Sequence, residues 1–379
     1  MAWNLIIVNV LSNLDYNLGK RWQQSLSLAF LLGLMTFLSV ANAIQVTVSI
    51  PPLAGLVQPL LGEKDSVKAV LKAGATPHGF QLKPSHLRQL QQSDLVLWSG
   101  TPIDSWMQKP LKSLAVNQLN FAELPFIQKW PIRKGGVWLG AHEHHSDEYG
   151  GNEHSVDKDG HKEKMLHANH EDSHEHESGH EHEQRKHHVD RSLELESEMA
   201  FDGHLWLSIE NSQLFVKAIS VQLQQLKPLE KNKIQQRTQV WLKTLSQLDK
   251  DVSLLLKPVQ NQPFLVLHDA FQYFEKHYQL NGIGSIQINP SIAPSLQRVY
   301  ELREKVKSGG AVCVFKEPQF PERRIAVITR NLNVKIGSLD PMGLVSKDST
   351  EFGRGFMAYD SFYKQLAQQF YNCLSVKTL

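Results

Sequence analysis

The segment "IQVTVSIPPLAGLVQPLLG", residues 44–62, begins with an apolar, partly β-branched run and continues through a proline pair into a helix-like sequence. This order predicts a buried strand, a turn and an amphipathic helix. The pattern returns at once: "SVKAVLKAG" (66–74) predicts a strand, "KPSHLRQLQQSD" (83–94) opens like a helix, and "LVLWSG" (95–100) is strand-like again. Alternating strands and helices are typical of a parallel sheet covered by helices, so we predict an α/β fold.

A second set of strand-like runs follows near the end of the chain. They are "PFLVLHDA" (263–270), "IGSIQINP" (283–290), "AVCVFKEPQF" (311–320) and "VKIGSLDPMG" (334–343), with the helix-like "SLQRVYELREKVKSG" (295–309) among them. The same alternation predicts a second α/β lobe. With 379 residues and a hydrophobic fraction of 41%, the chain is long enough to pack two domains.

One long helix is predicted between the two lobes, because Pro228 and Pro258 bracket a segment without glycine or proline. A helix of about 28 residues would be about 42 Å long. We therefore predict two Rossmann-like lobes, residues 44–228 and 258–379, joined by a single helix over 229–257. The apolar positions of this helix recur at steps of three, four or seven, at Ile234, Trp241, Leu245, Leu248, Val252 and Leu255.

The first 43 residues resemble a targeting segment. Lys20 and Arg21 precede an apolar run from 26 to 40, and "ANA" at 41–43 has the small-x-small form of a cleavage site. We predict a signal peptide that is cut after Ala43, which would export the mature protein to a compartment of the cell envelope. The alternative is an uncleaved membrane anchor, although the run is shorter than the ~20 residues that span a bilayer.

The chain contains two cysteines, Cys313 and Cys373. In a reducing compartment they would be two buried thiols, whereas in an exported chain a disulfide is favoured, and we predict the disulfide. By the chain-entropy relation, closing a loop of this length stabilises the fold by roughly 4 kcal/mol.

The overall charge argues against one class of partner. Forty basic and 38 acidic residues leave a formal net charge of +2, without the basic stripe that nucleic-acid binding requires. We therefore predict no nucleic-acid partner.

Thirteen of the 18 histidines lie between His142 and His188. The surrounding segment, about 141–198, has almost no apolar periodicity, and we predict a disordered insertion. Imidazoles interleaved with carboxylates would collect several metal ions loosely, and the alternative is a solvated loop without a role. The candidate auxiliary metal ligands of this tract are His142, His144, His145, His174, His176, His180, His182, His187 and His188.

The five other histidines divide into two groups. His86 and His277 lie in helix-like runs among polar side chains, so we predict that both are exposed. His78, His204 and His268 each lie in a loop or at the end of a strand, where open α/β sheets bind their ligands. Together these three offer nitrogen donors for a borderline cation such as zinc, with water or Asp340 in the fourth position.

At these positions the chain resembles a known family. The motifs are "GATPHGFQLKPS" with "DLVLWSG", the His-rich acidic insertion, "HLWLS", "LHDAFQYFEK", "CVFKEPQF" and "LDPMG", in that order over essentially the whole mature chain. They resemble the high-affinity zinc-uptake periplasmic substrate-binding proteins of bacterial ABC importers, within the zinc- and manganese-binding cluster A-I (cluster 9) group. The resemblance implies two α/β lobes joined by one long helix, with a metal site in the cleft between the lobes. It also implies that the metal ligands are His78 and His204 from the first lobe and His268 from the second.

The resemblance also carries details of the site. Manganese-binding members tend to have a carboxylate at the place of His268, so this histidine favours zinc. Asp340 corresponds to a carboxylate that is a ligand in some relatives and only near the metal in zinc-binding ones. Pro77 stands where some zinc-binding members have a glutamate, so no carboxylate ligand comes from that loop. The pair Cys313 and Cys373 matches the family's disulfide.

The implied function is capture of Zn²⁺ in the periplasm and its delivery to the membrane permease of an importer. A periplasmic metallochaperone is a second candidate partner, and we predict a monomer that is not an enzyme. Two alternatives stay open at this point. One is a protein of the same family that binds manganese or another divalent metal, and the other is a zinc hydrolase with a metal-bound water.

Overall fold

The computed structural model describes residues 43–133, 201–287, 290, 294–344 and 355–375. Nearly all of the predicted signal peptide and the whole histidine tract, with its nine candidate auxiliary ligands, lie outside these described residues. Within the described ranges, no helix combines the length and the apolar character that crossing a bilayer requires.

The first lobe is built on a parallel sheet of four strands in the order β2-β1-β3-β4. Val46 and Val48 of β1 are fully buried, and β1 pairs with both β2 and β3, as the alternation of strands and helices predicts. The fourth strand is not predicted from the sequence, because its three residues carry only one large apolar side chain, Leu119. The strands span Gln45–Val48 (β1), Ser66–Ala69 (β2), Leu95–Trp98 (β3) and Gln118–Asn120 (β4).

The second lobe repeats this topology, with the parallel order β6-β5-β7-β8. Three of its four strands fall inside the strand-like runs of the sequence and β6 begins one residue before its run, so both α/β lobes are confirmed. The strands span Phe264–His268 (β5), Gly282–Gln287 (β6), Cys313–Lys316 (β7) and Lys335–Ser338 (β8). The helices of this lobe span Gln272–His277 (α8), Leu296–Lys307 (α9) and Arg323–Thr329 (α10).

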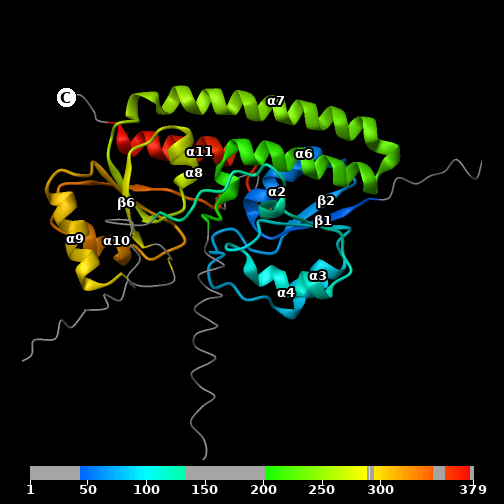
Figure 1. Cartoon of the computed structure of the whole chain (residues 1–379), viewed down its shortest axis with the longest axis horizontal. Helices are drawn as coiled ribbons and strands as arrows, with labels where there is room; N and C mark the ends of the chain where they lie inside the picture. Colours follow the sequence, from blue (N-terminus) through cyan, green and yellow to red (C-terminus); the bar gives the residue numbers. More distant parts are fainter. Residues whose placement is uncertain (1–42, 134–200, 288–289, 291–293, 345–354, 376–379) are drawn as a thin grey trace, which may run out of the picture.

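A single long helix, α7 (Lys231–Leu256), runs across both lobes above helix α6 (Ile209–Leu226) (Figure 1). Its 26 residues correspond to about 39 Å. Trp241 Nε1 donates a hydrogen bond to Leu56 O at 3.0 Å, which fixes α7 on helix α2 (Pro51–Val57) of the first lobe. The buried stripe of α7 is Ile234, Thr238, Trp241, Leu245, Leu248, Val252 and Leu256.

This stripe differs from the predicted one at its end, where Leu256 is buried and Leu255 is only half-buried. The helix itself lies inside the predicted segment. The exact division into lobes at 44–228 and 258–379 stays a prediction.

The C-terminal helix α11 (Tyr359–Leu374) packs below α7 and contacts both lobes (Figure 1). Near its start, the Tyr363 hydroxyl donates to Leu207 O at 3.0 Å in the first lobe. Near its end, Cys373 forms a disulfide with Cys313 of β7, which confirms the predicted pairing. One continuous hydrophobic core therefore passes from the first sheet through α11 to the second sheet.

Candidate metal centre

His78 lies in the loop that follows β2. Gly74 and Gly79 in this loop have φ angles of 83° and 74°, in the left-handed region that favours glycine. Trp106 Nε1 donates a hydrogen bond to Pro77 O at 3.2 Å, so the backbone directly before His78 is tied to the body of the first lobe. These constraints direct the histidine toward the second lobe.

His204 precedes a short 3₁₀ turn, Leu205–Leu207, that leads into α6. Asp202 Oδ1 accepts two hydrogen bonds from it, from the backbone N–H at 3.0 Å and from ring Nδ1 at 2.7 Å. The backbone between them packs tightly, because a Cβ on Gly203 would lie 2.6 Å from Ile103 Cγ1. The His204 ring is therefore held in one orientation, with Nε2 left available.

His268 is the last residue of β5, and Glu317 comes directly after the neighbouring strand β7. Glu317 Oε1 lies 2.5 Å from His268 Nδ1 and also accepts the His268 backbone N–H at 3.3 Å. The boundary between β5 and β7 is where the strand order of this sheet reverses, which is the usual place for a ligand in an open parallel sheet. Here, too, Nε2 is the nitrogen left for a metal.

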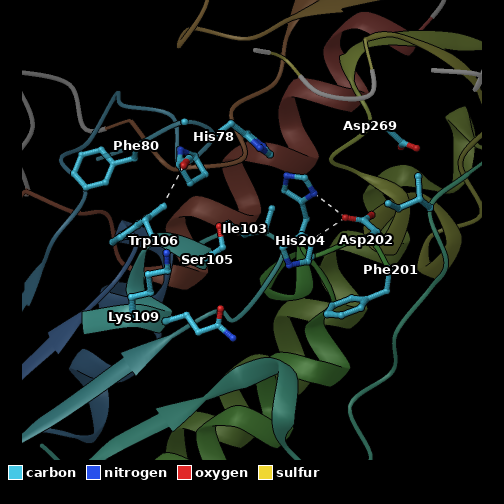
Figure 2. A pocket seen from close by; sticks show the side chains of 16 residues that line it. His78, Phe80, Ile103, Ser105, Trp106, Lys109, Phe201, Asp202, His204 and Asp269 are labelled. Carbon is cyan, nitrogen blue, oxygen red and sulfur yellow. Dashed lines mark hydrogen bonds and ion pairs between the residues drawn. The ribbon is translucent and has the colours of Figure 1, made fainter. Parts of the chain in front are cut away.

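The three rings meet between the lobes. Their centroids are 5.8 Å apart for His78 and His204, 5.4 Å for His78 and His268, and 5.3 Å for His204 and His268. Figure 2 shows the His78 and His204 rings next to each other, with Asp202 behind His204. The ligand atoms of all three lie within 4.8 Å of one another, and no second group of this kind occurs among the described residues.

The Nε2 atoms of His204 and His268 are 3.4 Å apart. Two nitrogens bound to one tetrahedral zinc at about 2.0–2.1 Å would lie roughly 3.3 Å apart, so this pair already has the right spacing. The Nε2 atom of His78 is buried and has no hydrogen-bond partner within the described residues. A small shift of His78 would complete a three-nitrogen site.

The electrostatics favour neutral imidazoles in the first lobe. Burial, together with the charge of the neighbouring histidines, lowers the pKa of His78 and of His204 well below the ordinary value. Burial opposes the charge on His268 as well, but the Glu317 carboxylate outweighs it and leaves the pKa of His268 raised. A divalent cation on Nε2 of His268 would displace the Nε2 proton of the charged ring, whereas the Nδ1 proton would stay in the hydrogen bond to Glu317.

Asp340 lies in the second lobe after β8, outside the histidine group. Its carboxylate accepts hydrogen bonds from Gln319 Nε2 at 2.6 Å, from Met342 N at 2.9 Å and from Leu344 N. These bonds hold the "LDPMG" turn. The assignment of Asp340 as the fourth ligand stays a prediction.

The two remaining described histidines are not fully exposed, so this part of the sequence prediction is wrong. His86, on helix α3 (Pro84–Gln91), is half-buried, and its Nδ1 accepts the Lys83 N–H at 3.0 Å. His277, at the end of α8, is also half-buried and pairs with Asp249 of α7 at 2.7 Å. Neither belongs to the metal-ligating group.

The chain matches a known protein family over most of its length. A family model described as "Zinc-uptake complex component A periplasmic" matches residues 46–373. The chain belongs to this family. Members of the zinc-uptake component A family are substrate-binding transport proteins, not enzymes.

Curated relatives cover nearly the whole chain. The zinc-uptake component of Yersinia pestis, "High-affinity zinc uptake system protein ZnuA", is 30% identical over 359 residues, which is 94% of this chain and 98% of that protein. A protein of the same name from Brucella suis is 29% identical, over 92% of this chain and 97% of its own length.

Solved structures of this kind share the fold. "Crystal structure of ZnuA" has a TM-score of 0.61 at 20% identity and covers 88% of this chain and 100% of that chain. The periplasmic zinc binding protein TroA from Treponema pallidum has a TM-score of 0.63 at 18% identity, with 88% and 100% coverage. Both agree with two α/β lobes joined by one long helix.

Sequence reasoning did not identify three residues that lie around the site. Asp202 and Glu317 orient the ligand rings, and Arg133 of the first lobe binds Asp269 and Glu275 of the second. Asp202 and Glu317 each had a signal, because one lies two positions before His204 and the other follows a predicted strand. No sequence signal pointed to Arg133, because its partners Asp269 and Glu275 are more than 130 residues away along the chain.

Proposed function

We propose that this protein captures Zn²⁺ in the periplasm with His78, His204 and His268 and delivers it to the membrane permease of an ABC importer. The observation that carries the proposal is the 3.4 Å separation of His204 Nε2 and His268 Nε2 across the two lobes. This separation suits one tetrahedral zinc, and each of these two rings is oriented by a carboxylate.

The donor set favours zinc over manganese. Three imidazole nitrogens suit a borderline cation, whereas manganese prefers carboxylate, carbonyl and water oxygens. No carboxylate belongs to the ligand group formed by the described residues. Copper and nickel also accept imidazoles, so discrimination against these metals depends on geometry and on metal supply.

The delivery step needs an exported protein that exchanges its ion with a permease. We infer that residues 1–43 form a signal peptide cut after Ala43, that residues 44–228 and 258–379 are the two lobes, and that the protein acts as a monomer. The histidine tract would concentrate metal ions near the lobes, and a periplasmic metallochaperone would be a second source of zinc. The signal peptide, the lobes and the role of the tract rest on the sequence patterns given above, whereas the monomeric state and the metallochaperone are expectations for a protein of this kind.

The test is a competition titration of zinc against a chromophoric chelator, with the mature chain and single alanine variants. One tight site per chain is expected for the parent. His78→Ala, His204→Ala and His268→Ala should each weaken zinc binding by at least about a hundredfold, because each removes one of three protein ligands. His86→Ala is the matched control and should keep the parent affinity. Equal, small losses in all four variants would contradict the site, and tighter manganese than zinc binding would favour the manganese alternative.

The role of the tract has its own test. Deletion of residues 142–190 should leave the single tight zinc site and remove weak additional binding, measured by equilibrium dialysis over a range of zinc concentrations. If the tight site disappeared with the deletion, the tract would be part of the primary site and the collector role would be wrong.

A further inference from the structure

Two cavities of very different size adjoin the three histidines. One, lined by all three rings together with Glu317 and Gln319, has a volume of only about 10 Å³. The other, of about 470 Å³, is lined by His78 and His204 and extends into the first lobe. Since a water molecule takes up about 30 Å³ of liquid, the larger cavity far exceeds the space needed by one metal-bound water.

The fourth coordination position has no side chain assigned to it within the described residues. Asp202 Oδ1 and Glu317 Oε1 are bound to the backs of the histidine rings, and Asp340 holds its own turn. A zinc ion on the three Nε2 atoms therefore keeps an open position. On the side of the small cavity there is no room for a ligand larger than water, so the larger cavity is the place from which one could bind.

The walls of the larger cavity suit an organic molecule with one negatively charged end. Apolar side chains form most of its surface, among them Phe80, Trp106 and Phe201. The Phe80 and Trp106 rings pack 4.8 Å apart, and Trp106 is fixed by its hydrogen bond to Pro77 O, so this wall is already formed. The volume lies within the roughly 300–1,000 Å³ of ordinary small-molecule sites.

Two polar groups lie at opposite sides of the cavity (Figure 2). Lys109 is exposed, and no ion pair to its ammonium group is found among the described residues. On the other side, Asp202 offers no accessible acceptor, because its Oδ1 atom is bound to His204 and its Oδ2 atom is buried. A ligand with a carboxylate would be complementary to the Lys109 ammonium group.

We propose that this cavity binds a small amino-acid chelator with a metal-binding side-chain nitrogen, such as histidine, that completes the coordination of zinc, so that the protein takes up zinc as a complex with this compound. This inference rests on the proposed zinc site. The chelator gives its side-chain nitrogen to the metal, its carboxylate faces Lys109, and its organic body packs against Trp106 and Phe80. No bond of the chelator is made or broken except its coordination to the metal.

The experiment uses the mature chain loaded with Co²⁺, whose d–d absorption reports its ligands, and L-histidine as the probe. Saturable change of the spectrum is expected, with cobalt retained by the protein after desalting. Acetate, which has a carboxylate but no organic body or amine, should have no effect at the same concentration. An equal effect of acetate would overturn the proposal, because the cavity walls would then contribute nothing.

Substitutions of residues that line the cavity test its role directly. Lys109→Gln should weaken the response to L-histidine about tenfold, since it removes one charge-assisted hydrogen bond. Ser105→Phe, which fills the cavity, should abolish the response. Lys112→Gln, at an exposed lysine of the same helix α4 (Gln108–Ser113), is the matched control and should respond like the parent. Equal responses of Lys109→Gln and Lys112→Gln would overturn the proposal.

The outcomes separate this inference from the proposed function. Tight one-to-one zinc binding without any response to L-histidine would overturn only the chelator site, whereas loss of tight zinc binding would overturn both. The same titration with residues 142–190 deleted should give the parent result. A response seen only after this deletion would also overturn the proposal, because the chain's own tract would then be the occupant.

Discussion

His204 and His268 come from different lobes and are 64 residues apart in the sequence, yet their Nε2 atoms lie 3.4 Å from each other. Each ring is held from behind by a carboxylate that accepts its Nδ1–H, from Asp202 in one case and from Glu317 in the other. The two nitrogens are thus placed for a metal by their surroundings. The carboxylates also make the imidazoles more basic and hence better ligands.

Replacing these carboxylates should weaken zinc binding without removing any ligand. Glu317→Gln and Asp202→Asn keep the shape of the side chain but lose the charge that orients and polarises the ring. We expect each to lower zinc affinity by about 10–100-fold in a chelator competition. Glu322→Gln, an exposed glutamate near β7 that pairs with Lys316, should leave the affinity unchanged. A loss of less than about threefold for Glu317→Gln would contradict the orienting role.

Arg133 joins the lobes through an ion pair that water hardly reaches. Its Nε lies 3.0 Å from both oxygens of Asp269, and its Nη1 donates to Glu275. The side chains of these two acids are 6% and 3% exposed. Arg133→Gln should therefore lower the free energy of unfolding by about 3–5 kcal/mol, since two carboxylates stay buried without their cation.

Urea unfolding followed by circular dichroism would measure this loss. Lys129→Gln is the control, because Lys129 is exposed and its ammonium group lies 4.8 Å from the centroid of the Phe201 ring. Burial already raises the pKa of Glu275 against the influence of Arg133. Adding Glu275→Gln to Arg133→Gln should restore part of the stability, and an unchanged double variant would argue against a burial penalty.

The pair His277 and Asp249 should make stability depend on pH. The hydrogen bond to Asp249 raises the pKa of His277, with a smaller contribution from Glu210 at 3.7 Å. Burial opposes the charge on Asp249, but His277 outweighs it and the pKa of Asp249 is lowered. The histidine contribution is present below pH about 6.5 and is lost as pH rises through its raised pKa, and the aspartate contribution is lost as pH falls below about 4.

Asp249→Asn should therefore cost about 0.5–1 kcal/mol between roughly pH 4 and 6.5, and less above pH 8. The asparagine still accepts the Tyr278 hydroxyl, so the difference isolates the charge. Asp251→Asn on the same helix is the control, and thermal unfolding over this pH range is the measurement. A pH-independent difference between Asp249→Asn and the parent would contradict the ion pair.

The disulfide should stabilise the fold substantially. It closes a loop of 60 residues between β7 and α11, which corresponds to about 4 kcal/mol by the chain-entropy relation. Unfolding by urea with and without a reductant should show this difference for the parent. Cys313→Ala/Cys373→Ala should be as unstable as the reduced parent and insensitive to reductant, and a difference below about 1 kcal/mol would contradict the entropic effect.

Much of this arrangement was predictable from local patterns. The strands with long apolar runs, such as Phe264–His268, are buried on both sides and are therefore visible in the sequence. Helix α7 was predicted from a long segment without glycine or proline. The three histidines that the structure brings together were singled out because each lies in a loop or at a strand end and because their motifs resemble those of the family.

What the sequence did not predict depends on contacts between distant segments. Strand β4 has three residues and little apolar character, so only its pairing with β3 defines it. The pairing of Arg133 with Asp269 and Glu275 arises only after the two lobes have packed. The half-buried state of His277 follows from its contact with α7, which a helix-like pattern alone does not reveal.

Helix α11 is fastened to the first lobe at Tyr359, whose hydroxyl lies 2.9 Å from Ser212 Oγ, and to the second lobe at Cys373. Helices α7 and α11 therefore connect the two lobes at separate places. Two such connections prevent the lobes from opening widely about a single hinge. We therefore expect a transport partner that takes the ion to displace individual ligand-bearing segments, and His78 is the least buried of the three histidines. Release of the ion would then be a local event that leaves the overall outline of the molecule nearly unchanged.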